Sequence, residues 1–592
     1  MRRLSIAALL IVFAWAGSVT AEWKPADGPL LSRWSDQVSP ENVWPEYPRP
    51  QMVRESWTNL NGLWDYAITE KDAERPEQWQ GEILVPFCVE SALSGVMKTV
   101  GPEKALWYHR AFTTPHLDDD RLLLHFGAVD WHATVWLNGE KLGEHQGGYD
   151  SFRFDVTDHL RKDTNDVVVR VWDPTDAGYQ PRGKQVLRPR GILYTAVTGI
   201  WQTAWLEPVS SSHIQSLRIT PDLDNHAVEV VADAAGGDGV TVRVAAEKDG
   251  TSATGKPGEP IRLKLDPKVY NQPWSPDEPQ LYDLKVELMR GDQAVDSVAS
   301  YFALRKIEVR KDEGGINRLF LNNKPLFQYG PLDQGWWPDG LYTPPCDAAL
   351  RYDIEVTKKL GMNMCRKHVK VEHPRFYYWT DKLGLLVWQD MPSGDRNIRG
   401  ADPDIIRSPE SGENFERELK AMIDTLSNHP SIVMWVPYNE GWGQWDTPRI
   451  CKLVRQWDAT RPVNNASGWV DRGVGDVNDI HRYPGPGIAP LEDDRAVVLG
   501  EFGGLGLPVA GHTWQKEKNW GYRKFDTPEA LTNAYLDLLK KLQPLVDQGL
   551  AAAVYTQTSD VEIEVNGLMT YDRDIIKLDV DRAREAAERL YE

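Results

Sequence analysis

Two glutamates in this chain stand where a carboxylate can take part in catalysis. Glu440 follows the apolar run 432–436 in the stretch SNHPSIVMWVPYNEGWGQW, and Glu501 follows the apolar run 496–500 in RAVVLGEFGG. Short runs of β-branched and aromatic residues are typical of strands that are buried on both faces of a parallel sheet. Because the carboxyl ends of the strands form the catalytic rim of a parallel barrel, we expect the two carboxylates to converge there.

A pair of converging carboxylates is what glycoside hydrolysis requires. One carboxyl group protonates the leaving oxygen, and the other attacks the anomeric carbon or activates water. A single glutamate after a strand is more often a cap or an ion-pair partner. The recurrence of the pattern, with Asn439 before Glu440 and Phe-Gly-Gly after Glu501, favours catalysis instead. The 61 residues between the two glutamates (501 minus 440) leave room for two or three further strand–helix units.

Both stretches also resemble a known family. HPSIVMWVPYNE and VLGEFGG are similar to the acid/base and nucleophile motifs of glycoside hydrolase family 2, which includes β-galactosidases, β-glucuronidases and β-mannosidases. The resemblance implies that Glu440 is the general acid/base and Glu501 the nucleophile of a retaining exo-β-glycosidase. Retention requires carboxyl groups about 5 to 5.5 Å apart, because at about 6.5 to 9.5 Å a water molecule has to intervene. It also requires Glu440 to be protonated while Glu501 is ionised.

The resemblance extends to residues that would support this pair. Arg366, in GMNMCRKH, matches the Asn-x-x-Arg signature of the family and would orient the nucleophile, with a purely structural salt bridge as the alternative. Asn439 resembles the residue that binds the sugar 2-hydroxyl, and Tyr483, in DIHRYPGP, resembles a tyrosine that donates to the nucleophile. His481 either faces the sugar or packs beside it. Asp390, in LLVWQDMP, either accepts from sugar hydroxyls or forms an ion pair at the rim.

The whole chain predicts a multidomain protein that combines β and α/β parts. Its 592 residues are too many for one core. Short alternating segments over 22–209 predict a β-sandwich that resembles the jelly-roll domain of the family, and residues 210–310 predict a smaller immunoglobulin-like β-sandwich. Residues 311–592 predict a catalytic (β/α)8 TIM barrel with Glu440 after strand four and Glu501 after strand seven. We place its strands at 326–329, 362–366, 385–389, 432–437, 463–466, 476–481, 497–500 and 552–557.

The amino-terminal domain of the family can contribute loops to the sugar pocket. Asp130, His145 and Arg182 are the candidates for such a contact here, with a structural ion pair as the alternative for each. In the same domain, Asn138-Gly139 predicts a tight hairpin turn.

The amino-acid composition limits the classes of molecule that the protein is expected to bind. A net charge of −20 without a basic stripe argues against nucleic acid, so we expect an oligosaccharide or glycoside as the partner. The 25 tryptophans suit sugar-stacking surfaces, although most of them would fill β-rich cores. The four cysteines have neither metal-type spacing nor a disulfide pattern, and we expect no metal and no cofactor.

The first 21 residues predict a signal peptide. Arg2 and Arg3 precede an apolar run that is too short to span a bilayer, and Val19-Thr20-Ala21 offers a small-residue cleavage site. The expected location of the mature protein is the periplasm or the cell exterior, with no membrane contact after cleavage. An uncleaved anchor is the alternative.

Departures from the family pattern set the expected sugar. Glu564-Val565-Asn566 stands where β-glucuronidases read the substrate carboxylate, and an acidic residue there would repel a uronate. Thr556 and Gln557 occupy the strand end where the clan often places a tryptophan platform. We expect a neutral sugar, galactose first, with β-mannosidase or β-glucuronidase specificity as alternatives. A non-catalytic glycan-binding protein on a decayed glycosidase scaffold is the alternative of another class. The chain has no G-x-S-x-G elbow and no H-E-x-x-H motif, which argues against a serine or zinc hydrolase.

Overall fold

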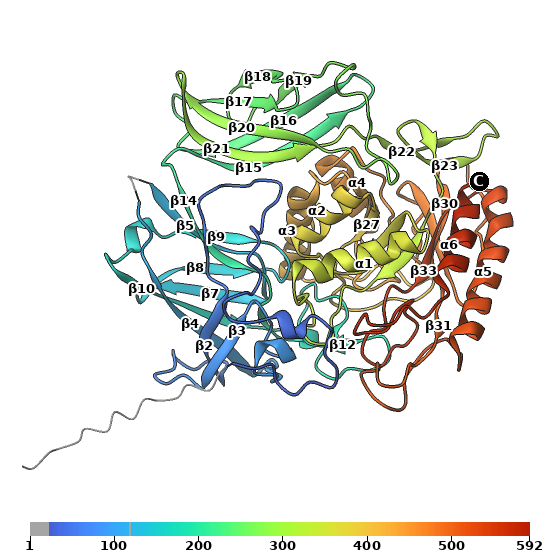
Figure 1. The fold of residues 1–592 in the computed structure, drawn as a ribbon, viewed down its shortest axis with the longest axis horizontal. Helices are drawn as coiled ribbons and strands as arrows, with labels where there is room; N and C mark the ends of the chain where they lie inside the picture. Colours follow the sequence, from blue (N-terminus) through green and yellow to red (C-terminus); the bar gives the residue numbers. More distant parts are fainter. Residues whose placement is uncertain (1–22, 118–119) are drawn as a thin grey trace, which may run out of the picture.

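The computed structural model describes residues 23–117 and 120–592, so the predicted signal peptide lies outside the described residues. Figure 1 shows a β-sandwich in blue and cyan, a smaller green sandwich above it, and a barrel in yellow to red beside both. This arrangement confirms the predicted fold class. In the part of the chain that is described, no helix is long and apolar enough to cross a membrane.

The amino-terminal sandwich consists of a four-stranded and a six-stranded sheet. Val167, Val169 and Val171 alternate along β10 and belong to the buried cluster between the sheets, as the period of two in a strand requires. The predicted turn at Asn138-Gly139 joins β7 to β8, with φ angles of 55° and 91° that suit these two residue types. The sheets run β1 (Thr58–Asn59), β14 (Ala204–Val209), β5 (Arg121–Phe126), β9 (Phe152–Asp155), and β3 (Gly81–Val85), β2 (Gly62–Glu70), β4 (Lys104–Thr113), β10 (Thr164–Trp172), β7 (His132–Leu137), β8 (Glu140–Gln146).

The second sandwich has a three-stranded and a four-stranded antiparallel sheet. Alternating valines of β16 and β17 fill the space between them. The next strand, β22 (Ile307–Lys311), spans the predicted boundary at residue 310 and pairs with β23 (Asn317–Leu321), followed by β24 (Lys324–Pro325). The sandwich strands are β15 (His213–Asp222), β16 (Ala227–Ala235), β19 (Ile261–Lys264), and β18 (Ser252–Gly255), β17 (Thr241–Ala246), β20 (Tyr282–Arg290), β21 (Gln293–Phe302).

The barrel sheet contains seven regular parallel strands, and an irregular segment closes it. The predicted fifth strand, 463–466, makes only isolated bridges, of Val463 to Trp435 and of Ser467 to Asn439. The side chains of Asn464 and the residue after it bind neighbouring aspartates, and the Asn464 amide donates to the Trp435 carbonyl. The regular strands run in the order β28 (Ile432–Val436), β27 (Leu386–Asp390), β26 (Met364–Lys367), β25 (Gln328–Asp333), β33 (Leu550–Thr556), β30 (Ala496–Gly503), β29 (Val477–Arg482).

Amphipathic helices cover the outside of the barrel (Figure 1). The helix that ends at Leu426 begins at Pro409, because Ser408 caps the amide of Ser411 and Pro409 occupies the first turn. Thr527 caps the long helix before the last strand in the same way. The helices are α1 (Asp347–Lys359), α2 (Pro374–Leu383), α3 (Pro409–Leu426), α4 (Thr447–Trp457), α5 (Pro528–Gln548) and α6 (Val580–Glu588).

Candidate active site

The structure brings Glu440 and Glu501 together at the carboxyl rim of the barrel. Glu440 lies beyond the end of β28, whereas Glu501 lies inside β30 and not after it, because that strand continues to Gly503. An oxygen of Glu440, an oxygen of Glu501 and a ring nitrogen of His481 all lie within 4.8 Å of one another. Glu440 has a φ of 51°, a conformation that a glutamate keeps only where its surroundings hold it. Its amide donates to the Ser467 carbonyl at 2.8 Å, which fixes this turn.

Two side chains hold the carboxylate of Glu501. Arg366 Nη1 donates to Oε1 at 3.2 Å, and the Tyr483 hydroxyl donates to Oε2 at 2.5 Å. Burial favours the neutral acid, but nearby positive charges, with His481 foremost and Arg366 among them, outweigh it and lower the pKa of Glu501 to about 2. Glu501 is therefore a carboxylate at neutral pH.

His481 lies between the two glutamates. Its Nδ1 is 2.8 Å from Glu440 Oε1 and 3.5 Å from Glu501 Oε2. Its Nε2 is 2.7 Å from Ser467 Oγ. Burial disfavours the charged ring, but the carboxylates of Glu501, Glu440 and Asp479 outweigh it and raise the pKa of His481. A charged imidazolium here reduces the repulsion between the two carboxylates.

Arg366 is fully buried and joins several of the predicted site residues. Its Nε and Nη2 donate to the two Asp390 oxygens at 3.0 and 2.8 Å, and Nη2 also donates to Asn439 Oδ1 at 2.8 Å. A third contact on Asp390 comes from His368 Nδ1 at 3.0 Å. Asp390 thus lies in a buried ion pair and does not line the pocket, whereas Asn439 does and keeps its amide nitrogen for a ligand.

The pocket in front of the carboxylates is enclosed by two domains. The barrel supplies most of its walls, and the amino-terminal sandwich adds two residues from a loop around β11 (Gln185–Val186) and β12 (Tyr194–Thr195). The lining residues are Lys184, Ile192, Leu332, Gln334, His368, Asn439, Glu440, Trp442, Tyr483, Glu501, Tyr522, Thr556 and Glu564.

Hydrogen bonds across the domain seam hold this loop in place. The Tyr194 hydroxyl bonds to the Glu564 carboxylate, and the Thr195 amide donates to Glu562 Oε1 at 2.7 Å. Lys184, in the same loop, is only 5% exposed. Its Nζ forms no hydrogen bond or ion pair with a residue in 23–117 or 120–592. The Tyr194 ring lies 5.6 Å from it, and its charge acts at longer range on the carboxylates of Glu564 and Glu501. The loop therefore brings an unpaired ammonium group to the pocket.

The three amino-terminal candidates from the sequence lie elsewhere. Asp130 accepts from Gln185 Nε2 at 2.8 Å, His145 Nε2 is 3.2 Å from an Asp150 oxygen, and none of Asp130, His145 and Arg182 is among the lining residues. The loop that does reach the pocket carries no local motif that marks Lys184. Its role depends on domain packing, which the sequence pattern does not reveal.

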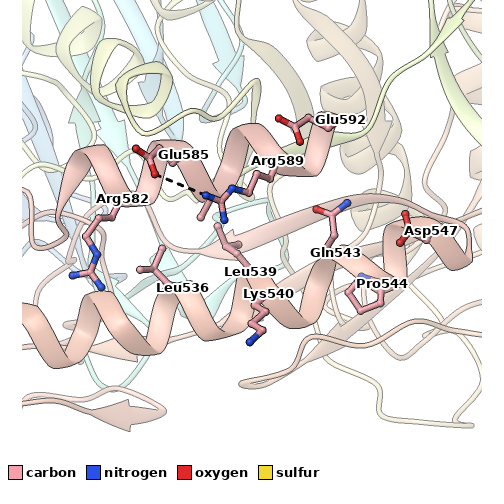
Figure 2. Close-up of a pocket in the computed structure, with 11 residues that line it drawn as sticks. Leu536, Leu539, Lys540, Gln543, Pro544, Asp547, Arg582, Glu585, Arg589 and Glu592 are labelled. Atoms are coloured by element: carbon pink, nitrogen blue, oxygen red, sulfur yellow. Dashed lines mark ion pairs between the residues drawn. The ribbon is translucent and has the colours of Figure 1, made fainter.

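A larger hollow lies outside the barrel, between α5 and α6, and Figure 2 shows its lining. This groove has a volume of about 820 Å³, and its charged residues include the pair Glu585 and Arg589 at 4.0 Å. It contains neither of the two rim glutamates. We therefore place the chemistry in the smaller pocket at the barrel rim.

Two groups of described side chains have the spacing of metal ligands. One is Glu440, His481 and Glu501, and the other includes His512 and Asp572. In both groups the histidine Nδ1 already contacts a carboxylate oxygen, at 2.8 Å in the first and 2.7 Å in the second. Neither group therefore offers a free imidazole nitrogen on that side, and we assign no metal.

Three family models match successive parts of the chain. Residues 92–190 match the model described as glycosyl hydrolase 2 galactose-binding domain-like, and residues 212–305 match the model of glycosyl hydrolases family 2. Residues 346–482 match the TIM barrel domain model of the same family. The three matches follow the order of the three parts in Figure 1.

Curated relatives and solved structures agree with these matches. A putative β-glucuronidase of Formosa agariphila is 28% identical over 422 residues, which are 67% of this chain and 48% of the relative. A β-galactosidase of Thermoanaerobacter pseudethanolicus is 26% identical over 60% of this chain and 48% of its own length. The chain thus spans about half the length of these curated relatives. A β-glucuronidase structure from Bifidobacterium dentium, 20% identical, has a TM-score of 0.71 over 92% of this chain and 99% of that one, which indicates a shared fold.

Proposed function

The chain belongs to glycoside hydrolase family 2, and from this premise we propose that it is a retaining exo-β-glycosidase. It would release a terminal β-linked sugar by double displacement, with Glu501 as nucleophile and Glu440 as acid/base. The observation that carries this proposal is the short distance between the two glutamates, whose nearest oxygens lie within 4.8 Å. Oxygens this close are compatible with the separation of about 5 to 5.5 Å between carboxyl groups that direct attack requires, which is shorter than the about 6.5 to 9.5 Å of an inverting pair.

The charges around the pair suit the same mechanism. Glu501 is ionised at neutral pH, and Arg366 and Tyr483 aim its oxygens. In the first step its oxygen bonds to the anomeric carbon while Glu440 donates a proton to the departing oxygen. In the second step Glu440 takes a proton from water, the water oxygen attacks the same carbon, and the bond to Glu501 breaks. Asn439, with its amide nitrogen free, is placed to donate to the sugar 2-hydroxyl.

We propose galactose as the first glycone to test, on the departures in sequence described above. The curated relatives support a β-glycosidase without deciding its glycone, since both β-galactosidases and β-glucuronidases are among them. The pocket walls from two domains suit the removal of a terminal sugar and not cleavage within a long chain.

A hexuronic acid is the second candidate glycone, and Lys184 favours it. The predicted repulsion of a uronate depends on the negative charge of Glu564. In the pocket, however, that carboxylate is bound by Tyr194 and Asn566, and burial raises the pKa of Glu564. The Lys184 ammonium lines the same pocket and forms no direct ion pair with a described carboxylate, although its charge acts on Glu564, so it can pair with a substrate carboxylate.

Initial rates on p-nitrophenyl β-galactoside, β-glucuronide, β-galacturonide, β-mannoside and β-glucoside test both candidates. Glu501→Ala should abolish release of p-nitrophenol from whichever sugar is accepted. Lys184→Gln should lower kcat/KM about 10-fold or more on uronides and change neutral glycosides little, because a charge-assisted hydrogen bond contributes about 1.5 to 3 kcal/mol. Release that survives Glu501→Ala would contradict the mechanism, and equal effects of Lys184→Gln on both classes would contradict the uronide reading.

We also propose that the protein is exported. This proposal rests on the sequence of residues 1–21 alone. Fractionation of the native host, with immunodetection of the mature chain, would test it.

A further inference from the structure

An exposed tryptophan stands next to the acid/base glutamate. Among the described residues, two aromatic side chains are exposed, Trp469 at 54% and Tyr522 at 43%. Tyr522 lines the catalytic pocket, and Trp469 lies beside His481. The Trp469 ring meets the His481 ring edge to face, with centroids 5.6 Å apart and an angle of 76°. His481 in turn contacts Glu440 at 2.8 Å. A single exposed apolar side chain needs no explanation, but this one lies at the reaction site.

The backbone beside Trp469 touches Glu440 directly. A Cβ placed on Gly468 would lie 3.2 Å from Glu440 Cγ, and Ser467 accepts the Glu440 amide at 2.8 Å. Trp469 is not among the residues that line the sugar pocket. The indole therefore lies outside the sugar pocket itself, beside His481 and next to the backbone that contacts Glu440.

The loop that carries Trp469 is held firmly on both sides. Val470 is buried, and its carbonyl accepts from Gln444 Nε2 at 2.9 Å. Asp471 accepts from Arg495 Nη1 at 2.8 Å and from Asn465 Nδ2 at 2.8 Å. A solvent-exposed indole on an anchored loop loses little conformational freedom when a ligand stacks on it.

We propose that Trp469 forms the subsite for the leaving group and receives the apolar face of its ring, a sugar or an arene. This inference rests on the proposed glycosidase function. The acid/base protonates the oxygen that joins the two halves of the substrate, so the departing ring must pass beside Glu440. Trp469 is the exposed aromatic surface on that side, and the apolar face of a pyranose or arene packs well on indole.

The first test compares leaving groups that do and do not contain a ring. Trp469→Ala should lower kcat/KM about 5- to 10-fold on a β-linked disaccharide or an aryl glycoside, from the loss of stacking and buried apolar area. The β-glycosyl fluoride of the same sugar has no ring to stack, and its kcat/KM should change less than about twofold. A loss on the disaccharide alone identifies a sugar as the natural ring, and a loss on the aryl glycoside alone identifies an arene. Equal losses on ring-bearing and fluoride donors would overturn the proposal.

Two further variants separate stacking from general damage. Trp469→Phe should recover most of the ring-dependent activity. Leu491→Ala removes another exposed apolar side chain, 47% exposed, which packs at Gly549 before the amino end of β33, and it should change neither donor class. If Leu491→Ala reproduced the Trp469→Ala pattern, the proposal would fail.

The second test measures ring binding without cleavage of a leaving group. A 2-fluoro glycosyl fluoride traps the Glu501 ester, and an added glycoside acceptor releases it: the acceptor oxygen bonds to the anomeric carbon, the ester bond breaks, and the acceptor proton passes to Glu440. Trp469→Ala should raise the acceptor concentration for half-maximal release about 5- to 10-fold and leave release by water unchanged. An unchanged acceptor dependence would overturn the proposal. Failure of the wild type to form any ester would instead refute the glycosidase function itself.

Discussion

Replacement of Glu440 by alanine gives the sharpest test of the roles assigned to the two glutamates. General acid catalysis contributes about 10²- to 10⁴-fold, and only when the leaving group needs the proton. We therefore expect Glu440→Ala to lower the rate of the first step by about that factor on a methyl or sugar leaving group. On a 2,4-dinitrophenyl leaving group, which departs as a stable anion, the same step should change little.

Azide then reports the geometry of the site. Loss of the Glu440 carboxyl opens space on the face of the sugar opposite Glu501, because in the wild type an oxygen of Glu440 lies within 4.8 Å of an oxygen of Glu501. Azide in that space attacks the Glu501 ester from the opposite face, so it should accelerate turnover of Glu440→Ala and give the β-glycosyl azide. In Glu501→Ala the vacated space lies on the other face, and azide should give the α-glycosyl azide.

Rates on paired leaving groups, with the azide products identified by NMR, provide the measurement. The reasoning fails if Glu440→Ala loses the same factor on methyl and dinitrophenyl glycosides, because a general acid must distinguish them. It also fails if Glu440→Ala yields the α-azide, which would exchange the roles of the two residues.

Three further predictions concern the residues around the pair. Asp390→Asn should destabilise the barrel by about 3 to 5 kcal/mol and leave KM for the sugar unchanged, because it breaks a buried pair with Arg366 and touches no ligand; urea unfolding and kinetics measure the two effects. The pKa of Glu501 is lowered from an ordinary 4.5 to about 2, so the ionised group stabilises the folded state above pH 4.5, and this stabilisation is lost as the pH falls toward 2. In thermal unfolding, Glu501→Gln should therefore lose less stability than the wild type between pH 4.5 and 2. Gly500→Ala should impair folding and activity because its Cβ would meet a buried aspartate oxygen at 2.2 Å, whereas Gly237→Ala, with its nearest contact at 3.9 Å, should not.

The strands that carry the catalytic glutamates could be located from the sequence because each is a short apolar run that ends at a polar residue. β28 was predicted within one residue, and β30 within one residue at its start. The end of β30 was missed because Glu501, Phe502 and Gly503 continue in extended conformation while the strand is bonded to both neighbours. An apolar pattern marks burial, and it does not report how far a ladder continues under polar side chains.

The fifth barrel strand was predicted from the sequence, but the structure has no regular strand there. Val463 and Ala466 gave it an apolar signature, but Asn464 binds Asp479 through its side chain and the chain forms only isolated bridges. Along this irregular segment, the Ser467 carbonyl accepts from the Glu440 amide and Gly468 lies against the Glu440 side chain. The apolar pattern of the sequence did not predict these contacts.

The residues missed altogether are those that depend on contacts between domains. Lys184 lies far from both glutamates in sequence, and nothing in its neighbours distinguishes it from a surface lysine. It reaches the pocket because Tyr194 bonds Glu564 of the barrel. The same bond also weakens the repulsion that the sequence predicted between Glu564 and a uronate, because the Glu564 carboxylate is bound to Tyr194 at the seam between the domains.

Under the proposed function, this seam would give the amino-terminal sandwich a direct part in selecting the sugar. The proposed nucleophile, the proposed acid/base and Arg366 all come from the barrel, so the proposed bond cleavage would use barrel residues alone. The charge of the pocket depends on both domains, because the sandwich adds the cation Lys184 near Glu564 and Glu501. A change in the loop around β11 can therefore alter which glycone binds while leaving the catalytic pair intact, and specificity within one family can diverge through domain packing without a change at the barrel rim.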